Sequence, residues 1–168
     1  MEKRIELIAK KFLEKIKDKK ILVVSHFDTD GITSAAIMIK TLKNLDKEFS
    51  VKIIKNLEEQ IIYDLPKDRV IIFLDLASNS LNYIENSKLK DVFIIDHHEI
   101  IQQIPENISI INPQLHNKEQ ISSSCLTYLF CKQITPKTKE LAKLAIIGMI
   151  GDMLEKNIDK LNNQILTE

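Results

Sequence analysis

Short runs of aliphatic and aromatic residues recur along this chain, each about as long as one buried strand. Most of them are continuous in Ile, Val, Leu and Phe, which is typical of strands covered on both faces. The second run alternates apolar and polar residues instead. The predicted strands are residues 21–25, 49–55, 69–77, 91–96 and 108–112.

Helical periodicity fills the segments between these runs. Residues 1–16 place Ile5, Ile8 and Phe12 on one helical face, and similar patterns follow most of the strands. The further helices are predicted at 33–45, 57–65, 79–88, 122–134, 136–153 and 154–165. Strands that alternate with helices predict an α/β fold, with a parallel, Rossmann-like sheet of about five strands and helices on both faces.

Length and composition fit one soluble globular domain. The chain has 168 residues, of which 44% are hydrophobic and 29% are charged. Lys plus Arg equals Asp plus Glu at 24 each, so no overall positive charge attracts nucleic acid. Cys125 and Cys131 match no zinc or redox spacing and are predicted to be buried free thiols. No run is long enough to cross a membrane, and we expect a cytoplasmic protein.

Acidic residues and histidines gather where the predicted strands end. The first strand is followed by His26, Asp28 and Asp30, and the third carries Asp75 after its apolar run. The fourth ends in Asp96, His97 and His98, and Asp152 follows a helical segment beside two glycines. Ligands of open parallel sheets bind beyond the carboxyl ends of the strands, so these side chains are expected to meet.

Carboxylates gathered at one edge repel one another, and divalent cations relieve that repulsion. Mixed Asp and His ligands suit Mn²⁺ better than an all-carboxylate set, which would suit Mg²⁺ or Ca²⁺. Such a set can hold two metal ions about 3.5–4 Å apart, an arrangement that serves phosphoryl chemistry. Taken singly, Asp75 would more often cap a helix and Asp152 would more often mark a helix end.

The motifs "SHFDTDG", "LDLA", "DHH" and "GMIGD", in this order and spacing, resemble the DHH phosphoesterase superfamily. The resemblance runs from Ile21 to Asp152. The first motif, followed by "TSA", looks most like the RecJ-like branch of single-strand exonucleases, particularly its archaeal members. The pyrophosphatase and nano-RNase branches set their first histidine further ahead of the aspartate pair.

The resemblance implies a ligand set for two Mn²⁺ ions, with Mg²⁺ as the alternative. Asp28 and Asp30 would bind one ion each, and Asp75 would bridge the two. His97 and Asp152 would complete the second site. His26 lies closer to the aspartate pair than in other branches, so metal ligation and a substrate-facing role both stay open for it.

Three further sets of residues have implied roles beside the metals. His98 would contact the substrate phosphate, and Asp96 would orient a histidine, because metal-bound imidazoles usually need such a partner. Ser122 and Ser123 lie at a predicted helix start, where amides can bind a phosphate of the substrate. Plain helix capping is the other interpretation of these serines.

The function that the resemblance implies is metal-dependent hydrolysis of phosphodiesters in single-stranded nucleic acid. One alternative is a phosphoesterase for nano-RNA, cyclic dinucleotides or pyrophosphate. Another is a binding module for replication factors such as GINS beside the replicative helicase. We expect the catalytic domain to span residues 1–152, with 153–168 forming a helix or a linker to a second domain. A separate subunit that binds the substrate is also left open.

Overall fold

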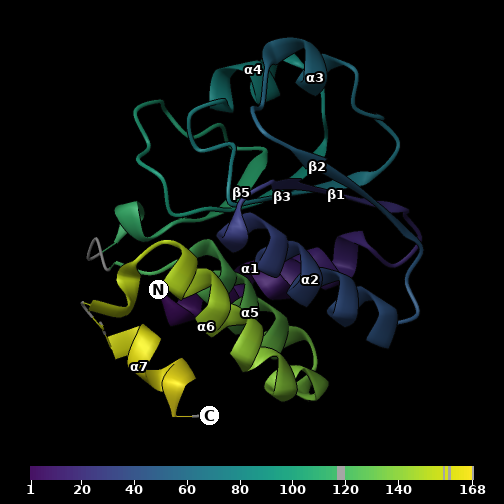
Figure 1. The fold of residues 1–168 in the computed structure, drawn as a ribbon. Coiled ribbons are helices and arrows are strands. Elements are labelled where there is room, and N and C mark those ends of the chain that lie inside the picture. Colours follow the sequence, from purple (N-terminus) through teal and green to yellow (C-terminus); the bar gives the residue numbers. More distant parts are fainter. Residues whose placement is uncertain (117–119, 157, 159, 168) are drawn as a thin grey trace.

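The computed structural model describes residues 1–116, 120–156, 158 and 160–167. The first four of five strands alternate with helices along the described chain, and β5 follows β4 without a helix between them (Figure 1). The strands are β1 Ile21–His26, β2 Phe49–Ile54, β3 Val70–Leu74, β4 Asp91–Ile95 and β5 Ile108–Ile111. The α-helices are α1 Glu2–Lys15, α2 Thr29–Asn44, α3 Glu59–Tyr63, α4 Leu81–Asn86, α5 Ser123–Ile134, α6 Ala142–Gly151 and α7 Lys160–Leu166. Short 3-10 helices cover Pro113–Leu115, Pro136–Leu141 and Leu154–Lys156.

All five strands are parallel and form one sheet in the order β2-β1-β3-β4-β5. The predicted α/β fold with a five-stranded parallel sheet is therefore confirmed. The chain first moves from β1 to β2 on one side, and then crosses back over β1 to β3. Connections that leave β1 and β3 in opposite directions open a crevice beyond their carboxyl ends, where sheets of this kind bind ligands.

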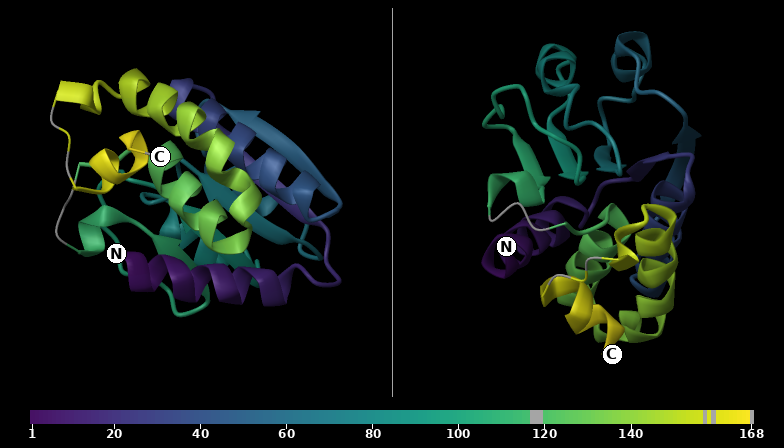
Figure 2. Two further views of the ribbon diagram at one scale, coloured as in Figure 1. Left: turned by 90° about the horizontal axis from the view of Figure 1, so that it is seen from below. Right: turned by 60° about the vertical axis from the view of Figure 1, so that its left-hand side comes forward.

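Two apolar layers enclose the sheet, because successive strand residues point to opposite faces. Val23 and Ile72 face a core shared with α1, α2, α5, α6 and α7. Val24 and Phe73 face a second core shared with the small helices α3 and α4. Figures 1 and 2 show the long helices gathered on one face of the sheet and α3 and α4 on the other. The edge strand β2 leaves the apolar residues Val51 and Ile53 exposed, so its alternating sequence does not indicate which of its residues are buried.

The turn from β1 into α2 brings the helix N-terminus very close to the strand. A Cβ atom at Gly31 would lie 2.4 Å from the carbonyl oxygen of His26, so only glycine fits there. Asp28 caps the helix by accepting a hydrogen bond from the amide of Gly31 at 2.9 Å. Ser25 donates to the Gly31 carbonyl at 2.7 Å and closes the turn. Gly31 therefore permits the close approach of α2 to β1.

The C-terminal third forms a helical layer with two departures from the predicted elements. The helix predicted to begin at Pro136 opens as a 3-10 helix and becomes α-helical only at Ala142. The helix predicted at 154–165 is split into a 3-10 turn and α7, and residues 157 and 159 lie outside the described residues. In α7, Leu161 and Ile165 are buried in the main core. The division of the chain at residue 152 stays a prediction.

Two smaller expectations can also be compared with the fold. Cys125 and Cys131 are free and buried, as the sequence predicted. Burial raises the pKa of both thiols to about 12, so they stay protonated and unreactive. Among the described residues, no helix combines the length and apolar character that a membrane span requires.

The tight turn at Gly31 yields a stability prediction. We expect Gly31→Ala to lower the free energy of unfolding by about 1–3 kcal/mol, because the added methyl group meets backbone atoms that cannot move away. Urea denaturation measures the change. Lys40→Ala, at an exposed position of the same helix, is the control and should change stability by less than about 0.5 kcal/mol. Equal midpoints for the two variants would contradict this account of the turn.

Candidate metal centre

The carboxyl ends of β1 and β3 bring a first group of possible metal ligands together. Nδ1 of His26 lies 2.8 Å from Oδ2 of Asp28 and 3.4 Å from Oδ2 of Asp75. One potential ligand atom from each of these residues lies within 4.8 Å of the others. Asp28 still has a lone pair free beside its capping bond to Gly31, because a carboxylate accepts several hydrogen bonds.

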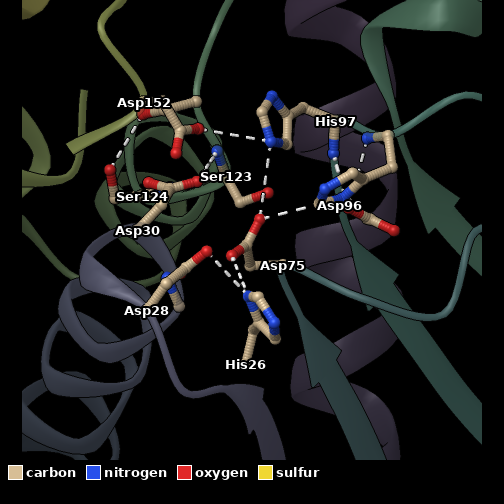
Figure 3. Close-up of polar contacts among 12 residues, drawn as sticks. His26, Asp28, Asp30, Asp75, Asp96, His97, Ser123, Ser124 and Asp152 are labelled. Carbon is tan, nitrogen blue, oxygen red and sulfur yellow. Dashed lines mark hydrogen bonds and ion pairs between the residues drawn. The ribbon is translucent and has the colours of Figure 1, made fainter. Parts of the chain in front are cut away.

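A second group lies beside the first and joins residues far apart in the sequence. Nε2 of His97 is 3.3 Å from Oδ2 of Asp152 and 3.5 Å from Oδ1 of Asp75. Asp30, His97 and Asp152 form this second group, with ligand atoms within 4.8 Å of one another, and Asp75 borders it through His97. Figure 3 shows Asp75 lying between the two groups, with its carboxylate directed toward both. The structure therefore brings together all six residues predicted from the sequence as metal ligands.

Asp75 is the most unusual residue of the centre. Its side chain is 1% exposed, and neither oxygen finds a hydrogen-bond partner among the described residues. Burial and the neighbouring carboxylates of Asp30 and Asp28 raise the pKa of Asp75 to about 10. Its backbone adopts a left-handed φ of 60°, a strained conformation that is often found at functional sites. A buried carboxylate that accepts no hydrogen bond from the described residues is one that a bound cation would stabilise.

Asp30 is held rigidly by the start of α5. Its two carboxylate oxygens accept hydrogen bonds from the amides of Ser123 and Ser124, at 2.7 and 2.9 Å. The hydroxyl of Ser122 caps the same helix by accepting from the amide of Cys125. These amides therefore point at Asp30, and Ser122 and Ser123 are fully buried. Substrate binding by Ser122 and Ser123 stays a prediction that this geometry does not support.

Gly148 allows α6 to approach this point. A Cβ atom there would lie 2.1 Å from Oγ of Ser124 and 2.6 Å from Oδ1 of Asp30. The close packing brings Asp152, at the end of α6, up to the carboxylates that come from the sheet. Burial, with the charges of Asp30 and Asp28, raises the pKa of Asp152 to about 7. This helix end is therefore part of the centre and not a simple terminus.

Asp96 organises the turn that carries both histidines. Its Oδ1 accepts from the amide of His97 at 2.8 Å and lies 2.7 Å from Nδ1 of His98. Its Oδ2 accepts from the amide of Ser78 at 2.9 Å. Although burial acts in the opposite direction, the bonds from His98 and Ser78 hold the pKa of Asp96 below its ordinary value. Asp96 is therefore placed to orient a histidine.

The two histidines of this turn have opposite protonation tendencies. Burial lowers the pKa of His97, which favours the neutral imidazole that binds metals. The hydrogen bond to Asp96 raises the pKa of His98, which is half exposed. His97 is thus suited to ligation, whereas His98 is suited to donate a hydrogen bond to an anion.

Several residues that shape the centre were missed by sequence reasoning. Asn112 donates hydrogen bonds of 2.9 Å to the hydroxyl of Ser78 and to the carbonyl of His98, and so ties two loops together. A polar residue directly after a strand was its only signal. Lys55 lines a hollow of about 240 Å³ with His26, Asp75 and His98. A larger hollow of about 590 Å³ lies beside the loop after β4, so volume alone does not locate the centre.

The donor set fits divalent cations. It combines carboxylate oxygens with imidazole nitrogens. Asp75, which accepts no hydrogen bond from the described residues, belongs to the first group and lies 3.5 Å from Nε2 of His97 in the second. Mixed oxygen and nitrogen ligands of this kind suit Mn²⁺, and Mg²⁺ suits the carboxylates. His26, Asp28 and Asp75 would hold one ion, and the second group would hold the other.

Comparison with known proteins identifies the family. The model of the DHH family, N-terminal domain, matches residues 20–149 of the chain. The chain therefore belongs to the DHH family, and the resemblance drawn from its motifs is confirmed. An uncharacterized protein of Methanocaldococcus jannaschii is 31% identical over 179 residues, covering 99% of this chain and 41% of that protein.

The single-stranded-DNA-specific exonuclease RecJ of Bacillus subtilis is a more distant relative. It is 24% identical over 153 residues, covering 82% of this chain and 20% of that protein. The chain thus spans less than half the length of the curated relatives that it matches.

Two solved structures share the fold. The crystal structure of exonuclease RecJ bound to manganese matches with a TM-score of 0.81 and 19% identity, over 96% of this chain and 46% of that one. The crystal structure of CDC45 from Entamoeba histolytica matches with a TM-score of 0.71 and 16% identity, over 99% of this chain and 36% of that one. At these identities the likeness shows the fold alone.

The raised pKa of Asp75 yields a prediction for the metal-free protein. Between the ordinary carboxyl pKa and about 10, the folded state keeps a proton that the unfolded state loses, so stability falls as pH rises. Asp75→Asn removes this dependence, and asparagine also tolerates a left-handed φ. We expect the advantage of Asp75→Asn over the unaltered protein in free energy of unfolding to be larger at pH 9 than at pH 5, growing by up to about 1.4 kcal/mol per pH unit. Melting temperatures measured across this pH range follow the change.

Metal addition and a control variant make this test specific. Mn²⁺ should raise the melting temperature of the unaltered protein and should not raise that of Asp75→Asn. Asp68→Asn, at an exposed position before the amino end of the same strand, should behave like the unaltered protein at each pH. If the stability difference between Asp75→Asn and the unaltered protein does not change with pH, the raised pKa of Asp75 is contradicted.

Proposed function

We propose that this chain hydrolyses phosphodiester bonds with the help of two divalent cations, as a RecJ-like nuclease module. The observation that carries the proposal is the buried carboxylate of Asp75, which accepts no hydrogen bond from the described part of the chain and contacts His26 on one side and His97 on the other. Membership of the DHH family and the relationship to an exonuclease in Bacillus subtilis support the same chemistry.

Asp75, Asp30 and His98 would have different roles in the reaction because of their positions. Divalent cations bound there would supply Lewis acidity toward phosphoryl oxygens and hydroxide near neutral pH. Asp75 would keep both ligand groups at a fixed separation, and the amides of α5 would keep Asp30 from turning away. His98, whose Nδ1 is engaged by Asp96, would donate through Nε2 to an oxygen of the substrate phosphate.

The proposed substrate is single-stranded DNA or RNA. The hollow at the centre is open, and His98, half exposed, lies at its wall, so a flexible strand can reach the ligands. Without a net positive charge, the chain should bind nucleic acid weakly, because neutralisation of phosphates by Lys and Arg dominates such affinity. A second domain or a separate subunit would add this affinity. We place the activity in cytoplasmic DNA repair or replication.

A second candidate role is supported by a specific likeness. The fold also matches CDC45 of Entamoeba histolytica, which is consistent with docking to replication factors of the GINS type. A purely structural module, however, would not need a strained, buried carboxylate among five further ligating residues. Co-purification with such factors would add a partner to the proposed enzyme without replacing its activity.

The first prediction of this proposal concerns activity. Purified protein with Mn²⁺ should degrade short single-stranded DNA or RNA faster than it hydrolyses pyrophosphate. Asp75→Asn should reduce the rate by about a thousandfold or more, because it removes the carboxylate that contacts both ligand groups. Release of nucleotides, followed by chromatography, measures the rate.

The matched variant Asp68→Asn should keep full activity, since it makes the same substitution at an exposed residue beyond the other end of β3. Full activity in Asp75→Asn would overturn the assignment. Faster hydrolysis of pyrophosphate than of oligonucleotides would favour the small-substrate alternative.

The second prediction separates His98 from the metal ligands. His98→Gln should lower kcat by about a hundredfold, which is typical for the loss of a positioned hydrogen-bond donor to the reacting group. The variant should keep the Mn²⁺-induced rise in melting temperature, because the proposed role of His98 is toward the substrate. If that rise disappears, His98 is a metal ligand and its proposed role toward the substrate is wrong.

A further inference from the structure

Phe27 lies at the rim of the metal centre, between two of its proposed ligands in the sequence. Its side chain is 47% exposed, although single exposed apolar residues are ordinary on protein surfaces. The position of this residue is more informative than its exposure. Its ring packs edge-on against the imidazole of His26, with the centroids 5.0 Å apart and the planes at 87°. The contact holds the ring beside the centre and leaves part of it open to solvent.

Lys55 adds a positive charge to the same rim. Its ammonium nitrogen lies 5.8 Å from the centroid of the Phe27 ring. Lys55 follows β2, and its exposed side chain lines the hollow that also contains His26, Asp75 and His98. A lysine ammonium on a flexible four-carbon stem can turn from the ring to a nearby phosphate. An aromatic ring and a cation therefore border the proposed reaction site together.

We propose that Phe27 and Lys55 form a subsite for the nucleotide beside the scissile phosphate, with the base stacked on Phe27 and a phosphate contacted by Lys55. The inference rests on the proposed function and specifies its substrate class as a strand that carries bases. Stacking on aromatic side chains is tolerant of sequence because every base has a π-face. Lysine contacts to phosphate position a strand without reading its sequence.

This subsite would make the centre prefer substrates that carry bases over substrates that do not. Pyrophosphate has no ring to stack on Phe27, so the subsite would favour nucleic acid over inorganic phosphates. Because the chain has no net positive charge, electrostatic attraction to phosphates adds little affinity for nucleic acid, and stacking would add affinity of another kind. The subsite reads no base edges, so it predicts little preference among sequences.

The test compares two single-stranded oligonucleotides of equal length, one ordinary and one with abasic residues. The unaltered protein with Mn²⁺ should have a KM for the ordinary strand that is about tenfold lower, within the range of base–aromatic stacking. Phe27→Leu should lose this preference, and Phe27→Tyr should keep it. Lys55→Met should raise the KM for both strands and leave the preference intact.

The control is Tyr63→Leu, which removes another partly exposed aromatic side chain, at the end of α3, and should keep the preference. A Phe27→Leu protein that still prefers the ordinary strand would overturn the subsite while leaving the proposed function in place. If no oligonucleotide is cleaved, the proposed function fails. The subsite is then tested by the fluorescence of a 2-aminopurine strand, which should be quenched by the unaltered protein and not by Phe27→Leu.

Discussion

Repulsion among carboxylates at one edge of the sheet is the constraint on which the centre depends. Asp28, Asp30, Asp75 and Asp152 come from three different parts of the chain and meet in a space where burial excludes much of the water. Burial first, and then the neighbouring carboxylates, make a charged Asp75 unfavourable in the metal-free protein, which is why its pKa rises to about 10. Cations remove the repulsion, so metal binding and the stability of this edge are coupled.

The fold tolerates this cluster because the rest of the structure holds it in place. The parallel sheet directs the ends of β1, β3 and β4 to the same edge, and the two apolar cores fix the strands. Gly31 lets α2 pack against the end of β1, and Gly148 lets α6 pack against Ser124 and Asp30. A methyl group at either position would collide with these neighbours. The amides at the start of α5 bind Asp30, and the Asn112 side chain ties the loop of His98 to that of Ser78. Asp30 therefore cannot relax by turning away from the other carboxylates.

The sequence predicted the parts of this arrangement that depend on local pattern. Continuous apolar runs predicted buried parallel strands, and the acids at their ends predicted a common edge, because parallel strands share one direction. The role of Asn112 could not be predicted, since its two partners come from distant loops. The helix start at Ser122 and Ser123 was predicted from the sequence to offer its amides to a phosphate. Only the packing of α5 against α2 shows that Asp30 already accepts the hydrogen bonds of the Ser123 and Ser124 amides.

The central claim is that paired cations occupy the space around Asp75. Crystals grown with Mn²⁺ and measured at the manganese absorption edge test it most directly, because anomalous scattering locates the ions. The account predicts two peaks about 3.5–4 Å apart on either side of the Asp75 carboxylate. A map with no peak beside Asp75, or with manganese bound only elsewhere on the surface, would contradict it.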